Sequence, residues 1–161
     1  MKGINIKREL IINKNIEEVW NVMGLQFGEV HIWSTNFKTS KPGGMSKFPE
    51  LDYSERITTT DRGETIQVLD SFDSSNYKLT YHITKGAPPI AKHASAVWSL
   101  VHEGNDKTKV IIEFNLITKG IMGFLMTPLI KIGIGKSAVE ITEDLKYYLE
   151  NGKPHPIKRL K

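Results

Sequence analysis

The Gly-rich segment Gly133-Ile134-Gly135-Lys136-Ser137-Ala138 is the part of this chain most similar to a nucleotide-binding motif. It matches the dinucleotide fingerprint G-x-G-x-x-A, in which glycines let the backbone approach a pyrophosphate. That fingerprint works only between two strands of a parallel sheet, and residues 151–161 are too few and too polar to form the second strand. A P-loop would need glycine at position 130, which is Ile130. We therefore expect no nucleotide and no other cofactor, and we expect the two glycines to reduce bulk where a helix faces a sheet or a cavity.

The other reactive side chains indicate neither a metal site nor a catalytic nucleophile. The chain contains no cysteine, which excludes disulfides, zinc–thiolate sites and thiol catalysis. No G-x-S-x-G nucleophile elbow occurs, and no two histidines have the H-x-x-x-H spacing of a metal site. We expect no metal, and the sequence identifies no catalytic residue. Two histidines are candidates for the mouth of a cavity, because His31 lies near Trp33 and His93 follows a Pro-rich loop.

Aromatic side chains on predicted inward strand faces suit either an ordinary core or the wall of a ligand site. Aromatic walls with a few polar groups are common in small-molecule sites. Arg56 and Gln67 would supply polar anchors if their strands turn these side chains inward. The predicted ligand-binding residues are Trp33, Arg56, Gln67, Tyr81, His93, Trp98, Phe114, Phe124, Ile130 and Ile134.

One long helix must position Phe124, Ile130 and Ile134, the C-terminal residues among the predicted ligand-binding residues. Between residues 120 and 150, apolar residues recur at steps of three or four, which places them on one helical face. Asn151-Gly152 followed by Pro154 predicts the helix end, and Pro128 predicts a kink. Such a helix spans about 40 Å, whereas a strand of eight residues spans about 27 Å. One helix can therefore cross a whole curved sheet, and the space between them is a natural small-molecule cavity.

The rest of the chain predicts one strand, two short helices and six further strands. Asn15 caps the first helix, which we expect to end early at Gly24, and Pro42 interrupts the second strand. Runs of antiparallel strands flanked by helices indicate an α+β fold. The predicted strands are residues 5–12, 36–41, 53–60, 64–72, 77–84, 94–102 and 109–118, and the short helices begin at residues 16 and 28.

Three of these strands have an inward face marked by apolar residues at every second position. Strand 64–72 is ambiguous, because Ile66 and Val68 alternate with Gln67 and Leu69. The predicted inward residues are Tyr77, Leu79, Tyr81, Ile83, Ala94, Ala96, Trp98, Leu100, Val110, Ile112, Phe114 and Leu116.

Length and charge predict one domain, residues 1–152, followed by a basic C-terminal tail, residues 153–161. The formal net charge of +4 is a tail effect, because residues 119–161 hold eight basic and four acidic side chains. No basic stripe with interleaved aromatics is present, so we expect no nucleic-acid partner. The N-terminus lacks the apolar core of a signal peptide, and the longest apolar stretch is too short to cross a bilayer. We expect a cytoplasmic protein without stable membrane insertion, and the oligomeric state is left open.

Four segments in this order resemble the START/polyketide-cyclase-like (SRPBCC) superfamily: Ile16-Glu-Glu-Val-Trp20, His31-Ile-Trp33, Lys85-Gly-Ala-Pro-Pro-Ile90 and 145–156. The resemblance implies a helix-grip fold, in which a seven-stranded antiparallel sheet curves around the C-terminal helix and encloses an apolar cavity. Members bind lipids, sterols, hormones or polyketides, and some are cyclases or dehydratases. Many members carry an acidic residue followed by Arg where this chain has Gln67-Val68, which weakens a transferred proton-transfer role.

The predicted function is the binding of a small hydrophobic or amphipathic molecule in an internal cavity, without a cofactor. We expect the ligand to enter between Lys85–Ile90 and Gly120–Phe124. One alternative is an enzyme of the polyketide cyclase or dehydratase type, which would need a general acid or base in the cavity. A second alternative is a protein-interaction module of the chaperone-cofactor type, which would show an exposed apolar groove.

Overall fold

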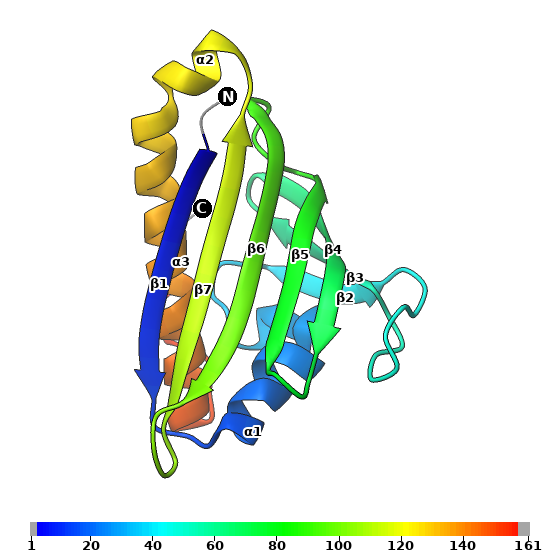
Figure 1. Cartoon of the computed structure of the whole chain (residues 1–161), viewed down its shortest axis with the longest axis vertical. Helices are drawn as coiled ribbons and strands as arrows, with labels where there is room; N and C mark the ends of the chain where they lie inside the picture. The colour runs from blue at the N-terminus through cyan, green and yellow to red at the C-terminus, as the bar shows by residue number, and fades with distance from the viewer. Residues whose placement is uncertain (1–2, 158–161) are drawn as a thin grey trace.

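A computed structural model describes residues 3–157, which form one seven-stranded antiparallel sheet in the order β1-β7-β6-β5-β4-β3-β2 (Figure 1). The first and last strands in the chain are neighbours, so the two ends of the sequence meet at one side of the sheet. The predicted seven-stranded antiparallel sheet is confirmed. The strands are β1 (Gly3–Ile12), β2 (Thr39–Gly43), β3 (Glu55–Thr60), β4 (Gly63–Asp73), β5 (Lys78–Lys85), β6 (Ala91–His102) and β7 (Thr108–Thr118).

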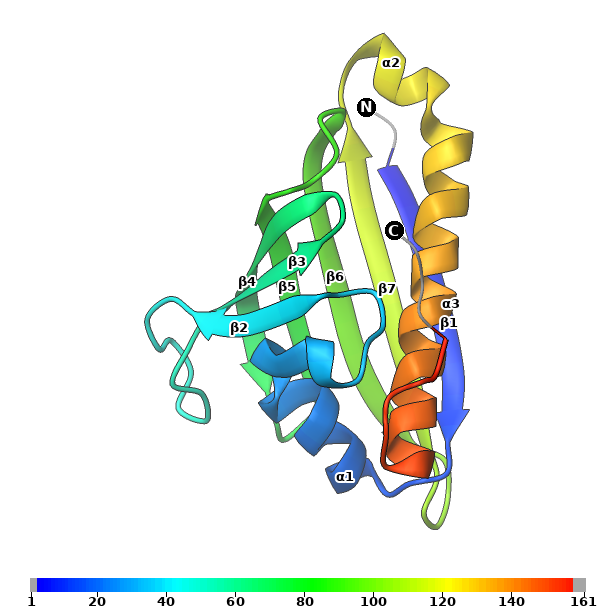
Figure 2. The same cartoon turned by 180° about the vertical axis from the view of Figure 1, so that it is seen from behind.

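The long helix α3 (Thr127–Asn151) runs along β1 and β7, and the short N-terminal helices cover the other side of the same sheet face (Figure 2). These short elements are the helix α1 (Ile16–Trp20), the π-helical turn η1 (Asn21–Leu25) and the 3₁₀ helix η2 (Phe27–Ile32). The predicted α+β, helix-grip architecture is therefore confirmed.

The predicted C-terminal helix is divided into α2 (Gly120–Leu125) and α3, with Met126 between them. Pro128 lies in the first turn of α3, where its missing N–H is not needed. Inside a continuous helix its ring would clash with the carbonyl group of residue 124, so the chain restarts instead of kinking. The predicted helix end is confirmed, because Gly152 adopts a left-handed conformation with φ of 70°.

The first helix does not end at Gly24 as the sequence predicts. The chain continues through a π-helical turn, and Gly24 lies directly under the Trp20 ring. A Cβ atom at this position would lie 2.6 Å from that ring. The glycine is therefore explained by close packing, not by helix termination.

The inward faces of β5, β6 and β7 are those that the alternation predicts, since Leu79, Ala96 and Ile112 are buried. Two register irregularities in β4, between Ile66 and Gln67 and between Leu69 and Ser71, change which residues point inward. Gln67 and Leu69 are buried as a result, which resolves the ambiguous strand.

Two apolar clusters lie between the helices and the sheet. The lower cluster surrounds α1, η1, η2 and the second half of α3, and includes Trp20, Trp33, Trp98 and Leu145. The upper cluster is much smaller: Ile4, Ala94 and Leu116 are buried, and Ile130 and Ile134 of α3 pack against them. The core is therefore concentrated at one end of the sheet.

After Gly152 the chain turns back beside α3 (Figure 2), and the His155 ring lies 4.6 Å from the Tyr147 ring. Residues 158–161, which complete the predicted basic tail, lie outside the described residues. No helix within residues 3–157 is long and apolar enough to cross a membrane.

Candidate ligand-binding site

Arg56 and Gln67 form a directly paired position on β3 and β4, and both side chains point into the molecule. Arg56 is 1% exposed. Its Nε donates a hydrogen bond to Gln67 Oε1, and its Nη1 donates to the backbone carbonyl oxygen of Phe27 at 3.2 Å. The condition set by the sequence, that both strands turn these side chains inward, is met.

Aromatic rings surround the Arg56 guanidinium. Its central carbon lies 3.9 Å from the Phe27 ring centroid, 5.1 Å from that of Trp98 and 5.2 Å from that of Tyr81. The negative ring faces attract the cation, and one desolvated contact of this kind contributes about 2 kcal/mol. Leaving one charge of a buried pair without its partner costs about 3–5 kcal/mol. The rings therefore offset much of the cost of burying this charge, but they do not neutralise it.

No carboxylate neutralises Arg56, since none of the ion pairs among residues 3–157 includes it. Burial lowers the pKa of Arg56 to about 10, while the nearby oxygens of Tyr81 and Tyr53 act in the opposite direction. Burial also raises the pKa of the Tyr81 and Tyr53 hydroxyls, so both stay neutral near pH 7. The site thus holds one buried positive charge among neutral groups.

Several buried polar atoms around this charge have no hydrogen-bond partner within the described residues. Trp98 Nε1 lies near the Tyr81 hydroxyl without the geometry of a hydrogen bond. Trp33 Nε1 is also unpartnered, and its ring lies 6.3 Å from that of Trp98. Native interiors rarely leave such groups unpaired, and each one requires an explanation. We call Trp33, Arg56, Gln67, Tyr81 and Trp98 the interior polar cluster.

An apolar wall continues upward from this cluster across three neighbouring strands. Tyr81 is paired with Ala96, which is paired with Phe114, and the next inward row contains Ala94, Leu116 and Ile4. Ile130 and Ile134 of α3 face this wall and are only partly buried. The two alanines have small side chains, and the upper cluster contains far fewer buried residues than the lower one.

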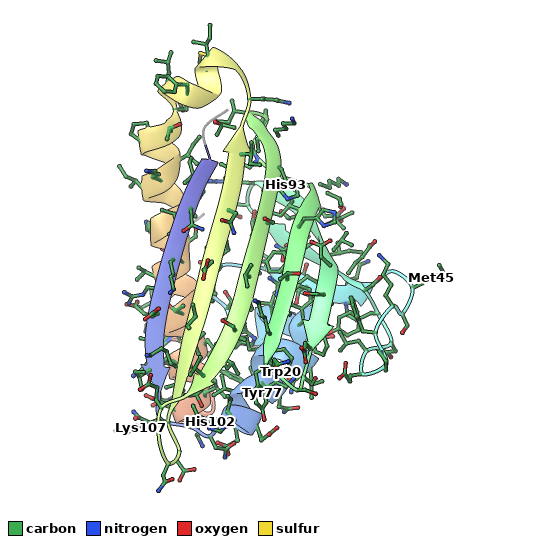
Figure 3. All side chains as sticks on the ribbon, viewed as in Figure 1. Trp20, Met45, Tyr77, His93, His102 and Lys107 are labelled. Carbon is green, nitrogen blue, oxygen red and sulfur yellow. The ribbon has the colours of Figure 1, made fainter. Side chains whose placement is uncertain are left out.

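The structure therefore brings most of the predicted ligand-binding residues to one interior face: five form the polar cluster, and Phe114, Ile130 and Ile134 border it. His93 is not among them. It is exposed on the outer face of β6, where its ring stacks 6.0 Å from that of His82 (Figure 3). Phe124 lies on α2 and is exposed, so it does not contact the interior polar cluster.

The two glycines of the nucleotide-like motif do not serve close packing against the sheet, which was one of the two reasons that we expected for them. A Cβ atom at Gly133 or Gly135 would meet no atom within 4 Å. Both residues lie inside α3, so the strand that a dinucleotide site would require is absent from this part of the described chain. Among residues 3–157, no group of His, Asp and Glu side chains could hold a metal ion.

The two predicted lips of the entrance, Lys85–Ile90 and Gly120–Phe124, lie at the same end of the molecule. The Lys119 amide donates to the Ile90 carbonyl at 2.9 Å, and Gly123 packs against Thr118. Gly86, at the start of the first of these segments, is not a free hinge. With φ of 85°, it lies so close to Glu64 that a Cβ atom would be 2.5 Å from the Glu64 carbonyl oxygen. The loop is therefore held tightly at its first residue.

A hollow lies on the surface between the η2–β2 connection and the chain that follows α3. It has a volume of about 360 Å³, and Phe37 and His31 line one side while His155 and Ile157 line the other. Phe37 also lies 5.9 Å from the Arg56 guanidinium carbon, measured to the ring centroid. Among residues 153–157, His155 is partly buried beside Tyr147, and the other four residues are exposed.

Sequence reasoning missed three interior residues that the structure adds. Phe27 supplies both a ring and a carbonyl oxygen to Arg56. Thr58 is buried two residues after Arg56, and its hydroxyl has no partner among residues 3–157. Arg8 interrupts an otherwise apolar alternation on β1, and its Nε is buried without a partner in the same part of the chain. A charged residue within an apolar alternation is the signal that could have identified Arg8.

The sequence matches no protein-family model and no curated protein. Solved structures match over most of their length. A START superfamily protein from Mycobacterium smegmatis aligns with a TM-score of 0.73 at 13% identity, covering 92% of this chain and 99% of that chain. A Thermobifida fusca protein aligns with a TM-score of 0.69 at 20% identity, covering 94% and 97%. A norcoclaurine synthase point mutant from Thalictrum flavum, in complex with a transition-state analogue, aligns with a TM-score of 0.71 at 12% identity, covering 94% and 96%. With its sheet, its grip helix and these likenesses together, the chain has the START/SRPBCC-like helix-grip fold.

Proposed function

We propose that this protein binds a small amphipathic molecule between α3 and the sheet. The polar end of the ligand lies at the interior polar cluster, and its apolar body follows the wall formed by Ala94, Leu116 and Ile130. The observation that carries the proposal is the presence of a buried charge and unpartnered indole N–H groups, among the described residues, in an otherwise apolar interior. A bound polar group would supply the partners that these atoms lack.

The distribution of apolar side chains supports an opening at the α2 end. Six large apolar residues between 121 and 132, on α2 and the first turns of α3, are 60–79% exposed. Burying each ligand methylene there would contribute about 0.8 kcal/mol before the costs of association. A ligand tail that leaves between α2 and the 85–90 loop would cover part of this exposed apolar surface.

The enzyme alternative has one observation in its favour. Tyr81 is a buried hydroxyl whose raised pKa keeps it protonated, so it could donate a proton to a ligand. A catalytic cycle also needs a base. The buried carboxylate of Asp144 accepts hydrogen bonds from the Thr35 amide and hydroxyl at 2.8 and 2.7 Å, which gives it a structural role. Binding is therefore the function that we propose.

Native mass spectrometry of the purified protein, compared with a denatured organic extract, tests the proposal directly. A co-purifying small molecule would identify the ligand class. A titration with a neutral apolar fluorophore such as N-phenyl-1-naphthylamine tests the cavity without requiring the natural ligand.

The matched variants for this titration are Ile130→Trp, which fills the interior, and Ile132→Trp, which adds the same ring on the exposed face. We expect the interior variant to weaken fluorophore binding at least about tenfold, equivalent to about 1.4 kcal/mol, and the exposed variant to leave it unchanged. Equal binding by both variants would place the fluorophore outside the proposed cavity, and no binding by the parent protein would refute the function.

A further inference from the structure

We infer that the ligand of the interior polar cluster is an anion, specifically an amphiphile with a single carboxylate group that pairs with Arg56. This inference rests on the proposed function and adds the chemical class of the ligand. Three independent features of the cluster lead to it: its charge, its balance of donors and acceptors, and its shape.

The charge of the cluster is positive and unbalanced. Arg56 contacts the neutral oxygens of Gln67, Phe27 and Tyr81 and several ring faces, and none of the ion pairs among the described residues involves it. A buried cation is stabilised most by an anion that also accepts its hydrogen bonds. A neutral polar group, such as an alcohol or a ketone, would leave the charge as it is.

The cluster also has more donors than acceptors. A guanidinium carries five N–H donors, and within residues 3–157 Arg56 finds acceptors in Gln67, in Phe27 and in the Tyr81 hydroxyl, so donors remain in excess. The indole N–H groups of Trp33 and Trp98 add two donors without partners in this part of the chain. An ionised carboxylate only accepts hydrogen bonds and has about four acceptor positions, so it complements this excess.

One acceptor does not fit this trend, since Asn36 Oδ1 is buried without a partner among the described residues. The same amide carries two donors, so Asn36 remains compatible with an acceptor ligand. The Thr58 hydroxyl can donate or accept. Neither residue adds a negative charge to the cluster.

The residues around Arg56 suit an amphiphile better than a small anion. Arg56 presents a planar fork that matches a carboxylate. Above it, the inward residues of β6 and β7 are alanine, phenylalanine and leucine, which bind an apolar body. Arg8 is a second cationic side chain on the inward face of β1, where it is paired with Ile112, and Ile112 is paired with Trp98.

The experiment compares dodecanoate with 1-dodecanol, which share a chain length and differ in the head group. Each is titrated against the full chain, with displacement of the neutral fluorophore as the readout. We expect the parent protein to bind dodecanoate about 10- to 100-fold more tightly than the alcohol. Equal affinities would overturn the inference and leave the proposed function intact, whereas displacement by neither ligand would refute both.

Three variants test whether Arg56 causes the preference. In Arg56→Gln the two ligands should bind with about equal affinity, because the preference for dodecanoate is lost while the affinity for 1-dodecanol stays within about twofold of the parent value. Arg56→Lys should keep part of the preference for dodecanoate. Arg62→Gln removes an exposed arginine on the turn after β3 and should change nothing. A preference that survives in Arg56→Gln would overturn the inference. If that variant does not fold, the comparison of head groups in the parent protein still decides the question.

Discussion

The two halves of α3 share one helix but have opposite surroundings. In the second half, Ile141 and Leu145 are buried in the lower cluster, and polar groups hold the helix in place. Asp144 binds Thr35, and Lys146 Nζ donates to the Ile11 carbonyl oxygen at 2.8 Å. The first half, together with α2, exposes large apolar side chains and meets only the small upper cluster.

This difference separates stability from binding within one element. The second half of α3 resembles an ordinary core helix, whose apolar face and hydrogen bonds lock it onto the sheet. The first half has few neighbours, and segments with few buried apolar contacts open at low free-energy cost. We infer that the lower half, which also contains the interior polar cluster, stabilises the fold, and that under the proposed function the upper half admits the apolar body of the ligand.

The largest expected effect is the loss of stability when a lower-half leucine is truncated. Leu145 is 0% exposed, so Leu145→Ala should lower the free energy of unfolding by about 2–5 kcal/mol. Leu129 lies on the same helix and is 62% exposed, so Leu129→Ala should change stability by no more than about 0.5 kcal/mol. Urea denaturation followed by circular dichroism measures both. Similar losses in the two variants would contradict the division of α3.

The next effect is ligand protection of the proposed entrance. At a ligand concentration of about 100 times Kd, binding stabilises the closed state by about 2.7 kcal/mol. Amide hydrogen exchange in Lys85–Ile90 and Gly120–Phe124 should then slow by up to about 100-fold. Exchange in the second half of α3 should be slow with or without ligand. Protection limited to residues 31–38 and 153–157 would place the ligand in the hollow lined by Phe37 and His155 instead.

Most of the fold could be predicted from the sequence. In β5, β6 and β7, inward and outward residues alternate without interruption, so their buried faces can be read from the sequence. It left β4 ambiguous, since the phase changes at the two register irregularities. Its prediction that the site includes His93 conflicts with its own register, because an inward Ala94 turns the preceding residue outward. The orientation of β3 could not be read from Glu55–Thr60, since the buried face of this strand is formed by Arg56 and Thr58.

The spacing of apolar residues also could not predict that the first half of α3 is exposed. A stripe of apolar residues predicts one buried face, and Ile130 and Ile134 do lie on the side that faces the sheet. The exposed residues Ile121, Leu129 and Ile132 lie off that stripe. Their exposure depends on how far the neighbouring strands and loops extend around the helix, which only the tertiary structure reveals.

A third, smaller effect concerns glycine in the packed half. Gly24→Ala would place a Cβ atom 2.6 Å from the Trp20 ring, which is itself buried against Phe72. Overpacking of this kind costs about 1–3 kcal/mol. The thermal midpoint should fall accordingly, and the fluorophore affinity should stay unchanged because the upper wall is not involved. An unchanged midpoint would mean that α1 can shift and that the lower cluster is less rigid than its burial suggests.

The smallest effect is the opposite substitution in the open half, Gly133→Ala. A Cβ atom at this position would have no atom within 4 Å, so the added methyl group meets no obstacle in the protein. Glycine inside a helix costs about 1 kcal/mol relative to alanine, because it loses more backbone freedom on folding. Gly133→Ala should therefore raise the free energy of unfolding by up to about 1 kcal/mol, measured by urea denaturation. If the glycine serves to keep this part of α3 pliable during ligand entrance, the same variant should slow fluorophore association in stopped-flow experiments while leaving its affinity within about twofold. A loss of stability would show that the space beside Gly133 is occupied in solution, and would remove the first half of α3 from the open region of the molecule.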